Sequence, residues 1–157
     1  MYKKILSFIL AMLCIMSCAV VGVSAAGNGT PVMEGNFKAV YYSDGTAMLY
    51  EASVDEAHVV IPETVGGYVI TEISNAFANN KKIKSVTIPD TVTGVLGSAF
   101  RNCTNLESVT VYATTPPSLG NWPFDDTNDC PIYVPSGSVN TYKSAWPGYA
   151  SRIQSIP

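Results

Sequence analysis

A segment of about 23 residues recurs along this chain, and it constrains the fold more than any other feature. The stretch NAFANNKKIKSVTIP (residues 75–89) aligns with SAFRNCTNLESVTVY (residues 98–112) at a step of 23 positions. Aligned apolar positions stay apolar, while most polar positions between them vary. The apolar pairs are Phe77 and Phe100, Ile83 and Leu106, Val86 and Val109, and Ile88 and Val111. This pattern is typical of a repeat array, in which each unit completes its core only with its neighbours.

The same period extends in both directions. Ile132 and Val134 follow Val109 and Val111 by 23 positions. Upstream, residues 60–65 match residues 87–92 at a step of 27, because four extra residues lie around Gly66-Gly67-Tyr68. Insertions in repeat arrays normally fall in loops. We therefore predict four strand positions, near Val60, Val86, Val109 and Ile132.

Each unit ends in a short alternating segment rich in β-branched residues, which favours a strand. Alternation directs Val86 and Ile88 to one side and Thr87 to the other. Stacked at roughly 4.8 Å, successive strands are expected to form one parallel sheet. Phe77 and Phe100 are expected to fill the space behind it.

Both ends of the array are predicted to be covered by polar caps. Asp44-Gly45, between two aromatic-rich runs, predicts a β-hairpin over residues 36–58. At the other end, residues 136–157 are expected to form a helical cap, with Ser138 capping a helix that begins at Val139. Val139, Tyr142 and Trp146 share one helical face, and Pro147-Gly148 ends the helix.

The first 25 residues have the layout of a secretory signal peptide. Lys3 and Lys4 precede an apolar run over residues 5–23, and Val23-Ser24-Ala25 places small residues at the cleavage site. We expect cleavage near Ala25 or Ala26, followed by a flexible leader over residues 26–35. Two alternatives stay open: a retained membrane anchor, and a lipoprotein with Cys18 as the lipidated residue. The protein is expected to be secreted or held at the cell surface.

The repeat pattern AF, then N-[NC]-x-x-[IL]-x-S-V-T-[IV]-P, resembles the BspA-like leucine-rich repeat family. The stretch IYVPSGSVNTYKSAWPGYASRI (residues 132–153) is similar to the end unit of that family. The resemblance covers about Phe37 to Ile156. It implies an α+β repeat fold, a short right-handed leucine-rich-repeat solenoid with a parallel sheet over residues 59–135, from a secreted or surface bacterial protein. For some members it implies adhesion to host or neighbouring cells, and it carries no catalytic residues.

Composition and motifs argue against several function classes. Only 13% of residues are charged and the net charge is −3, so a nucleic-acid surface has little support. The sequence has one histidine, His58, and contains no nucleophile motif for which that histidine could act as the base. No cofactor motif is present. The acidic run Asp125 to Cys130 lacks the glycine and distal glutamate of a calcium loop. We expect no enzyme activity, no cofactor and no bound metal.

After signal cleavage two cysteines remain, Cys103 and Cys130. Secretion permits a disulfide between them. Their places in the repeat also fit small buried side chains without a partner. Both interpretations stay open.

The remaining route to function is a binding surface. The predicted ligand-binding face consists of Lys84, Ser85, Thr87, Glu107, Ser108, Thr110, Tyr112 and Tyr133. We expect a non-enzymatic module that binds protein or glycan on a host or neighbouring cell surface. The alternative is an architectural or self-assembling secreted repeat unit without a dedicated ligand. Aromatic anchors for binding are Tyr112, Trp122, Tyr133 and Tyr149, unless most of them pack against the terminal cap.

Overall fold

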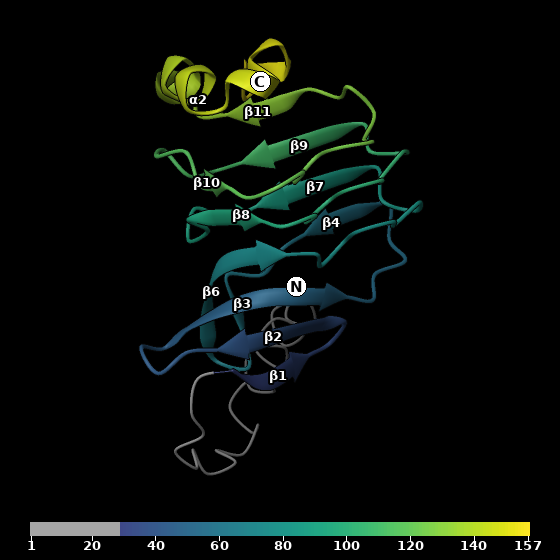
Figure 1. The fold of residues 1–157 in the computed structure, drawn as a ribbon, viewed down its shortest axis with the longest axis vertical. Helices are drawn as coiled ribbons and strands as arrows, with labels where there is room; N and C mark the ends of the chain where they lie inside the picture. Colours follow the sequence, from purple (N-terminus) through teal and green to yellow (C-terminus); the bar gives the residue numbers. More distant parts are fainter. Residues whose placement is uncertain (1–28) are drawn as a thin grey trace, which may run out of the picture.

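The computed structural model describes residues 29–157 of the chain. The predicted signal peptide (residues 1–25), Cys18 and the start of the predicted leader lie outside the described residues. Strands succeed one another along the long axis, from β1 (Thr30–Glu34) at one end to β11 (Ile132–Val134) and the helix α2 (Val139–Ala145) at the other (Figure 1). None of the helices in the described part of the chain is long and apolar enough to cross a membrane.

One sheet is built by the repeated strands and is parallel throughout. Its order is β12-β11-β9-β7-β4. The strands are β4 (His58–Val60), β7 (Ser85–Ile88), β9 (Ser108–Val111), β11 (Ile132–Val134) and β12 (Ile153–Ser155). Val86 pairs with Val109, and Val109 pairs with Ile132, so the 23-residue step sets the register as predicted. Strand β12 is an additional rung that the repeat pattern did not predict.

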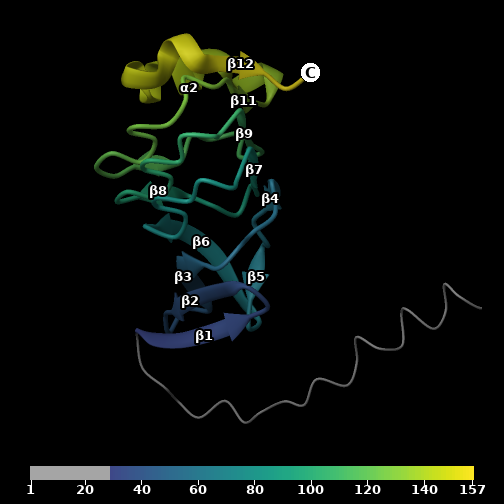
Figure 2. The same cartoon turned by 90° about the vertical axis from the view of Figure 1, so that its right-hand side faces the viewer.

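A second sheet of seven strands departs from the prediction of one sheet. Its main path is β1-β2-β3-β6-β8-β10, with β5 paired to β6. The bounds are β1 (Thr30–Glu34), β2 (Phe37–Tyr41), β3 (Thr46–Ala52), β5 (Thr64–Val65), β6 (Tyr68–Ser74), β8 (Gly94–Leu96) and β10 (Ser118–Leu119). Figure 2 shows β8 on one side of the molecule and β9, β7 and β4 on the other. The repeats that begin with β4, β7 and β9 thus each supply strands to both sheets.

The predicted hairpin at Asp44-Gly45 is confirmed, since β2 and β3 pair antiparallel. Strand β3 then pairs parallel with β6, so the hairpin continues the second sheet. The leader prediction is wrong for residues 30–34, which form β1 and pair antiparallel with β2. Their backbone groups find partners in that hairpin ladder, which a flexible leader would lack. The inserted Gly66-Gly67 is not an open loop but the tight turn between β5 and β6, with φ angles of +60° and +84°.

The space behind the parallel sheet is filled by a stack of phenylalanines, as predicted. The rings of Phe77 and Phe100 lie 5.0 Å apart between centroids, and those of Phe100 and Phe124 lie 5.4 Å apart. All three side chains are buried, together with the inward strand residues such as Val86 and Val109. The core is therefore continuous from one repeat to the next.

An asparagine recurs two positions after Phe77 and Phe100, and the local backbone conformation explains why. Asn79 and Asn102 both adopt left-handed backbone conformations, with φ of +65° and +61°. Asparagine tolerates this region better than most residues. The Asn102 side-chain amide donates to the side-chain oxygen of Asn79 at 2.8 Å, so the repeated residue also links neighbouring turns.

The C-terminal segment packs over the last repeat through buried aromatic side chains. The Tyr142 hydroxyl donates to the Ala113 carbonyl at 2.7 Å, and the Trp146 indole N–H donates to the Pro117 carbonyl at 2.9 Å. The predicted capping role of Ser138 is wrong for its side chain. Its hydroxyl donates instead to the Thr114 carbonyl at 2.8 Å. The α-helix ends at Ala145, and the 3-10 segment Pro147–Arg152 leads into β12.

Candidate binding face

The outer face of the parallel sheet carries the side chains that alternate with the buried valines and isoleucines. We call this surface the outer face. Ser85 and Thr87 on β7, and Ser108 and Thr110 on β9, are half-buried and alternate with the buried residues of their strands. Tyr133 continues the row on β11, because it pairs with Thr110. The structure therefore brings the predicted strand residues together on one surface.

The other three predicted residues flank the strands. Lys84 and Glu107 precede β7 and β9, and their side chains form an ion pair with 3.0 Å between Nζ and Oε1. Tyr112 follows β9 and is 52% exposed. Lys84 and Glu107 thus pair with each other at the amino ends of the strands. Tyr112 lies at the carboxyl ends, where its ring is exposed to solvent.

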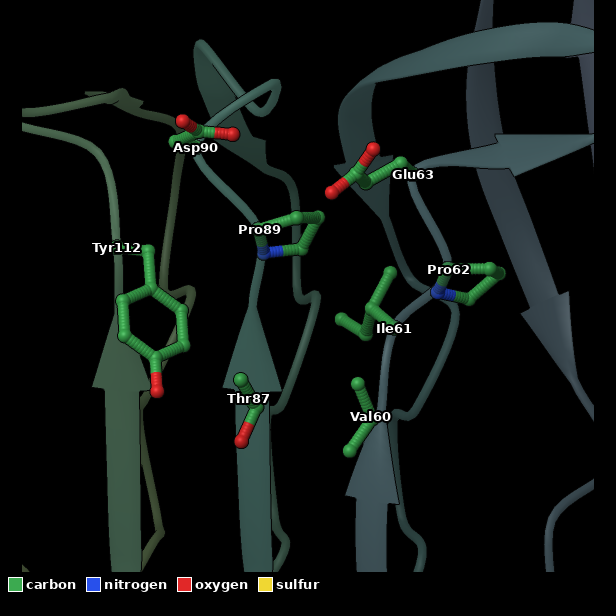
Figure 3. Close-up of a pocket in the computed structure, with 8 residues that line it drawn as sticks. All are labelled: Val60, Ile61, Pro62, Glu63, Thr87, Pro89, Asp90 and Tyr112. Atoms are coloured by element: carbon green, nitrogen blue, oxygen red, sulfur yellow. The ribbon is translucent and has the colours of Figure 1, made fainter.

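A hollow of about 560 Å³ lies at the carboxyl ends of β4, β7 and β9. We call it the strand-end hollow (Figure 3). Its lining residues are Val60, Ile61, Pro62, Glu63, Thr87, Pro89, Asp90 and Tyr112. In Figure 3 Tyr112 forms one side and Val60, Ile61 and Pro62 the other, with Thr87 and Pro89 between them. Val60 is 70% exposed, so Val60 and Tyr112 together place two large apolar side chains in solvent at this hollow.

The repeat explains why these residues meet. Ile61-Pro62-Glu63 follows β4, and Ile88-Pro89-Asp90 begins at the last residue of β7. The two motifs meet because β4 and β7 are parallel and end at the same edge of the sheet. The isoleucines are buried, whereas both carboxylates are exposed. Tyr112 occupies the position of Pro89 one repeat later. The hollow thus has Pro62 on one side and the Tyr112 ring on the other, because the column that holds proline in two repeats holds tyrosine in the next.

Sequence reasoning placed only Thr87 and Tyr112 of this hollow on the binding face. It missed Val60, Pro62, Glu63 and Asp90. The signal was present in the repeated Ile-Pro-acid motif, whose two copies align at a step of 27 residues. Their meeting as one surface depends on the parallel register, which brings both motifs to one edge.

A second hollow of about 550 Å³ adjoins the first. It is lined by Asp90, Val92, Thr93, Tyr112, Ala113, Thr114, Thr115, Pro116 and Ser118. Asp90 and Tyr112 belong to both hollows. The two depressions therefore flank Tyr112 and continue the outer face toward the loop that precedes β10.

The other residues singled out in the sequence have local partners. His58 Nδ1 lies 2.8 Å from the Ser85 hydroxyl. In the acidic run, Asp125 accepts a hydrogen bond from the Tyr149 hydroxyl at 3.2 Å, and Asp126 lies 3.7 Å from Arg101 Nε. Within residues 29–157, no group of three or more His, Cys, Asp or Glu side chains is placed to hold a metal ion.

Cys103 and Cys130 are both free and buried. Burial raises the pKa of the Cys103 thiol to about 11 and also raises the pKa of the Cys130 thiol. The Cys103 thiol donates to the Phe77 carbonyl at 3.1 Å, and Cys130 receives Arg152 Nη2 at 3.3 Å. In this structure both residues are small buried side chains, the second of the two interpretations.

Of the four predicted aromatic anchors, two are exposed and two are not. Tyr112 and Trp122 are 52% and 58% exposed. Tyr149 packs edge-on against Phe124, with 5.5 Å between ring centroids, and Tyr133 is half-buried. Arg101 lies 5.7 Å from the centroid of the Trp122 ring, at the side of the molecule where the phenylalanine turns lie. Only Tyr112 thus joins an exposed aromatic ring to the outer face.

Comparison with known proteins supplies the family. The profile described as "BspA type Leucine rich repeat region (6 copies)" matches residues 71–156, more than half of the chain. A leucine-rich repeat protein from Bacteroides capillosus ATCC 29799 is similar in structure, at 26% identity and a TM-score of 0.50. The match covers 66% of this chain and 97% of that one.

A leucine rich cell surface protein from Faecalibacterium prausnitzii A2-165 is similar at 24% identity and a TM-score of 0.47. The match covers 85% of this chain and 31% of that longer protein. Among curated proteins no match is found.

Proposed function

Because the chain belongs to the BspA-type leucine-rich repeat family, we propose that it is a non-enzymatic, exported binding module. The proposed target is a protein or glycan at a cell surface, and the proposed contact surface is the outer face with its strand-end hollow. The observation that carries the proposal is the meeting of two exposed apolar residues, Val60 and Tyr112, at one hollow. Exposed apolar surface rimmed by polar groups marks interaction sites.

The repeat architecture supports a surface of this kind. We infer that the two sheets and the phenylalanine stack form a short right-handed solenoid. In this view the β1–β3 region and the segment over residues 136–157 are its terminal caps. Solenoids of stacked repeats use extended faces for binding because each repeat adds a row of side chains to the same surface. The rows Ser85–Ser108 and Thr87–Thr110 are of this type.

The proposed location rests on the N-terminal sequence. Lys3, Lys4 and the apolar run over residues 5–23 have the order of a secretory signal. Export would place the outer face where surface proteins and glycans of host or neighbouring cells are available.

An array of glycans and extracellular-matrix proteins tests the proposal. The full chain is expressed with its own leader and purified after export, as wild type, Tyr112→Ala, Tyr133→Ala and Trp122→Ala. We expect binding to at least one target that Tyr112→Ala reduces by about tenfold or more, as for an aromatic hot spot. Trp122→Ala is the matched control, because it removes an exposed aromatic ring away from the outer face. Binding that survives Tyr112→Ala and Tyr133→Ala but is lost in Trp122→Ala would place the site elsewhere.

A second function, self-assembly without a dedicated ligand, is favoured by one observation. Strand β12 (Ile153–Ser155) is an end strand of the parallel sheet and pairs only with β11 among the described strands. An end strand can pair with a further chain. Light scattering after size exclusion separates the two functions, since an oligomer at low micromolar concentration supports assembly and a monomer supports a binding module.

A further inference from the structure

We propose that the strand-end hollow captures a basic side chain, lysine or arginine, from an extended segment of a partner protein. This inference rests on the proposed binding function of the outer face and names the chemistry of its partner. A protein target is thereby favoured over a glycan.

The first argument is the balance of hydrogen-bond donors and acceptors in the strand-end hollow. Pro62 and Pro89 have no backbone N–H. The N–H groups of Ile61 and Tyr112 already donate to the carbonyls of Thr87 and Ile88, each at 3.0 Å. Among the lining side chains, only the Thr87 and Tyr112 hydroxyls can donate, whereas Glu63 and Asp90 supply four carboxylate oxygens.

Lining side chains that offer more acceptors than donors favour a group that only donates. Lysine and arginine side chains are donors without acceptors. Sugar hydroxyls both donate and accept, so a glycan would leave much of its acceptor capacity unpaired here. The donor–acceptor balance therefore favours a cationic side chain.

The second argument is charge complementarity. Four carboxylates elsewhere in the described chain have ion-pair partners: Glu51 with Lys38, Asp55 with Lys82, Glu107 with Lys84, and Asp126 with Arg101. No ion pair or side-chain hydrogen bond joins Glu63 or Asp90 to another residue in this part of the structure. In Figure 3 their carboxylates lie at the same end of the hollow, on either side of Pro89. A cation placed there would meet two uncompensated negative charges.

The third argument is the apolar surface beside the carboxylates. The aliphatic stem of lysine or arginine is covered by apolar surface while its head stays polar. Val60 and Pro62 supply such a surface on one side, and the Tyr112 ring supplies an aromatic face for a cation on the other. The hollow thus suits both parts of a long basic side chain.

The fourth argument concerns the length of the bound segment. The adjoining hollow shares Asp90 and Tyr112 with the first and extends past Val92 to Ser118. A segment that places its basic residue in the strand-end hollow can place a neighbouring residue beyond Tyr112. An extended peptide spans two such depressions, whereas a compact group would occupy one.

Titration with short peptides tests the proposal. The probes are acetylated, amidated Ser-Leu-X-Leu-Ser peptides with X as arginine, lysine, citrulline or glutamate. They are added to the exported, ¹⁵N-labelled chain, and amide shifts are followed by NMR. We expect the arginine and lysine peptides to shift the amides of Val60, Thr87 and Tyr112. The citrulline and glutamate peptides should bind at least about tenfold more weakly, the loss expected when a charge-assisted hydrogen bond is removed.

Paired variants separate specific capture from general attraction to an acidic protein. Glu63→Gln/Asp90→Asn should weaken the arginine peptide by about tenfold or more. Glu56→Gln/Asp129→Asn removes two exposed carboxylates outside the hollow and should leave the affinity within about twofold. Equal loss in both double variants, or equal binding of the citrulline and arginine peptides, would overturn the proposal. So would an array in which Tyr112-dependent binding is confined to glycans, although the proposed function would then survive.

Discussion

Phe100 is the residue on which the continuity of the core depends most directly. Its ring is fully buried between those of Phe77 and Phe124. Phe100→Ala would remove contacts on both sides and leave a cavity, so we expect the free energy of unfolding to fall by about 3–5 kcal/mol. Urea denaturation measures this change. Tyr112→Ala is the control and should stay within about 0.5 kcal/mol, because that ring is half-exposed.

The Cys103 thiol makes stability depend on pH in the alkaline range. Burial raises its pKa from 9.0 to about 11 in the folded chain. Its contribution to stability is therefore complete below pH 9 and is lost as the pH rises toward 11, because only the unfolded thiol ionises readily there. We expect Cys103→Ala to reduce the loss of unfolding free energy between pH 8 and 10.5 by about 2 kcal/mol.

Chemical denaturation at several pH values checks the Cys103 prediction. Some loss should remain in the variant, since burial also raises the pKa values of Cys130, Tyr142 and Tyr149. An identical pH slope in wild type and Cys103→Ala would contradict the assignment to this thiol.

At the scale of single residues, the sequence predicts burial better than function. Val86, Val109 and Ile132 could be placed on one ladder because a fixed step repeats a buried, β-branched residue. Glu63 and Asp90 could not be placed in one hollow, because their proximity depends on the parallel pairing of β4 and β7. Ser138 was misassigned because its hydroxyl reaches a carbonyl 24 residues away, which helix-capping rules do not consider.

Among the elements, the C-terminal segment packs over the last repeat, and we expect it to stabilise that repeat by covering its strand and its aromatic stack. Tyr142 and Trp146 are buried, and Arg152 Nε donates to the Cys130 carbonyl at 2.8 Å. Deleting residues 137–157 would also remove β12 from its place beside β11. We expect an aggregating or unfolded product without a cooperative thermal transition, as measured by circular dichroism and light scattering.

A point variant at an exposed position of the same helix serves as a control for the truncation, because it changes α2 without removing any side chain that covers the last repeat. Lys143→Ala changes an exposed residue of α2 and should leave the melting temperature unchanged within about 2 °C. If the truncated chain melted cooperatively near the parent temperature, the covering role of residues 137–157 would be refuted.

Two of the strands that sequence reasoning missed are too short to carry a pattern. Strands β8 (Gly94–Leu96) and β10 (Ser118–Leu119) have three and two residues, so no alternation can be read from them. Leu96-Gly97 and Leu119-Gly120 do recur, but a recurring dipeptide does not distinguish a strand from a turn. Strand β1 was missed because Thr30 to Glu34 adjoin glycines, and its pairing with β2 is set by the hairpin beside it.

At the scale of the whole molecule, the outer face is narrow. Five strands at about 4.8 Å span only about 20 Å. A standard protein interface buries about 800 Å² on each partner, and binding through a smaller surface is weak. Each repeat adds only one narrow row of side chains to the outer face. Because few repeats are present, the contact area is small, and the affinity of one copy for its target is limited.

Presenting several copies of the chain together should offset the weak binding of a single outer face. We expect a single exported chain to bind its array-identified target with a Kd of about 1 μM or weaker. Biotinylated chains tetramerised on streptavidin should bind a dense target surface at least about 100-fold more tightly, because later contacts form at high effective concentration. Biolayer interferometry at low and high target density measures both values. Tetramerised Tyr112→Ala is the matched control and should lose the gain, whereas nanomolar binding by the monomer would show that the contact surface extends well beyond the outer face.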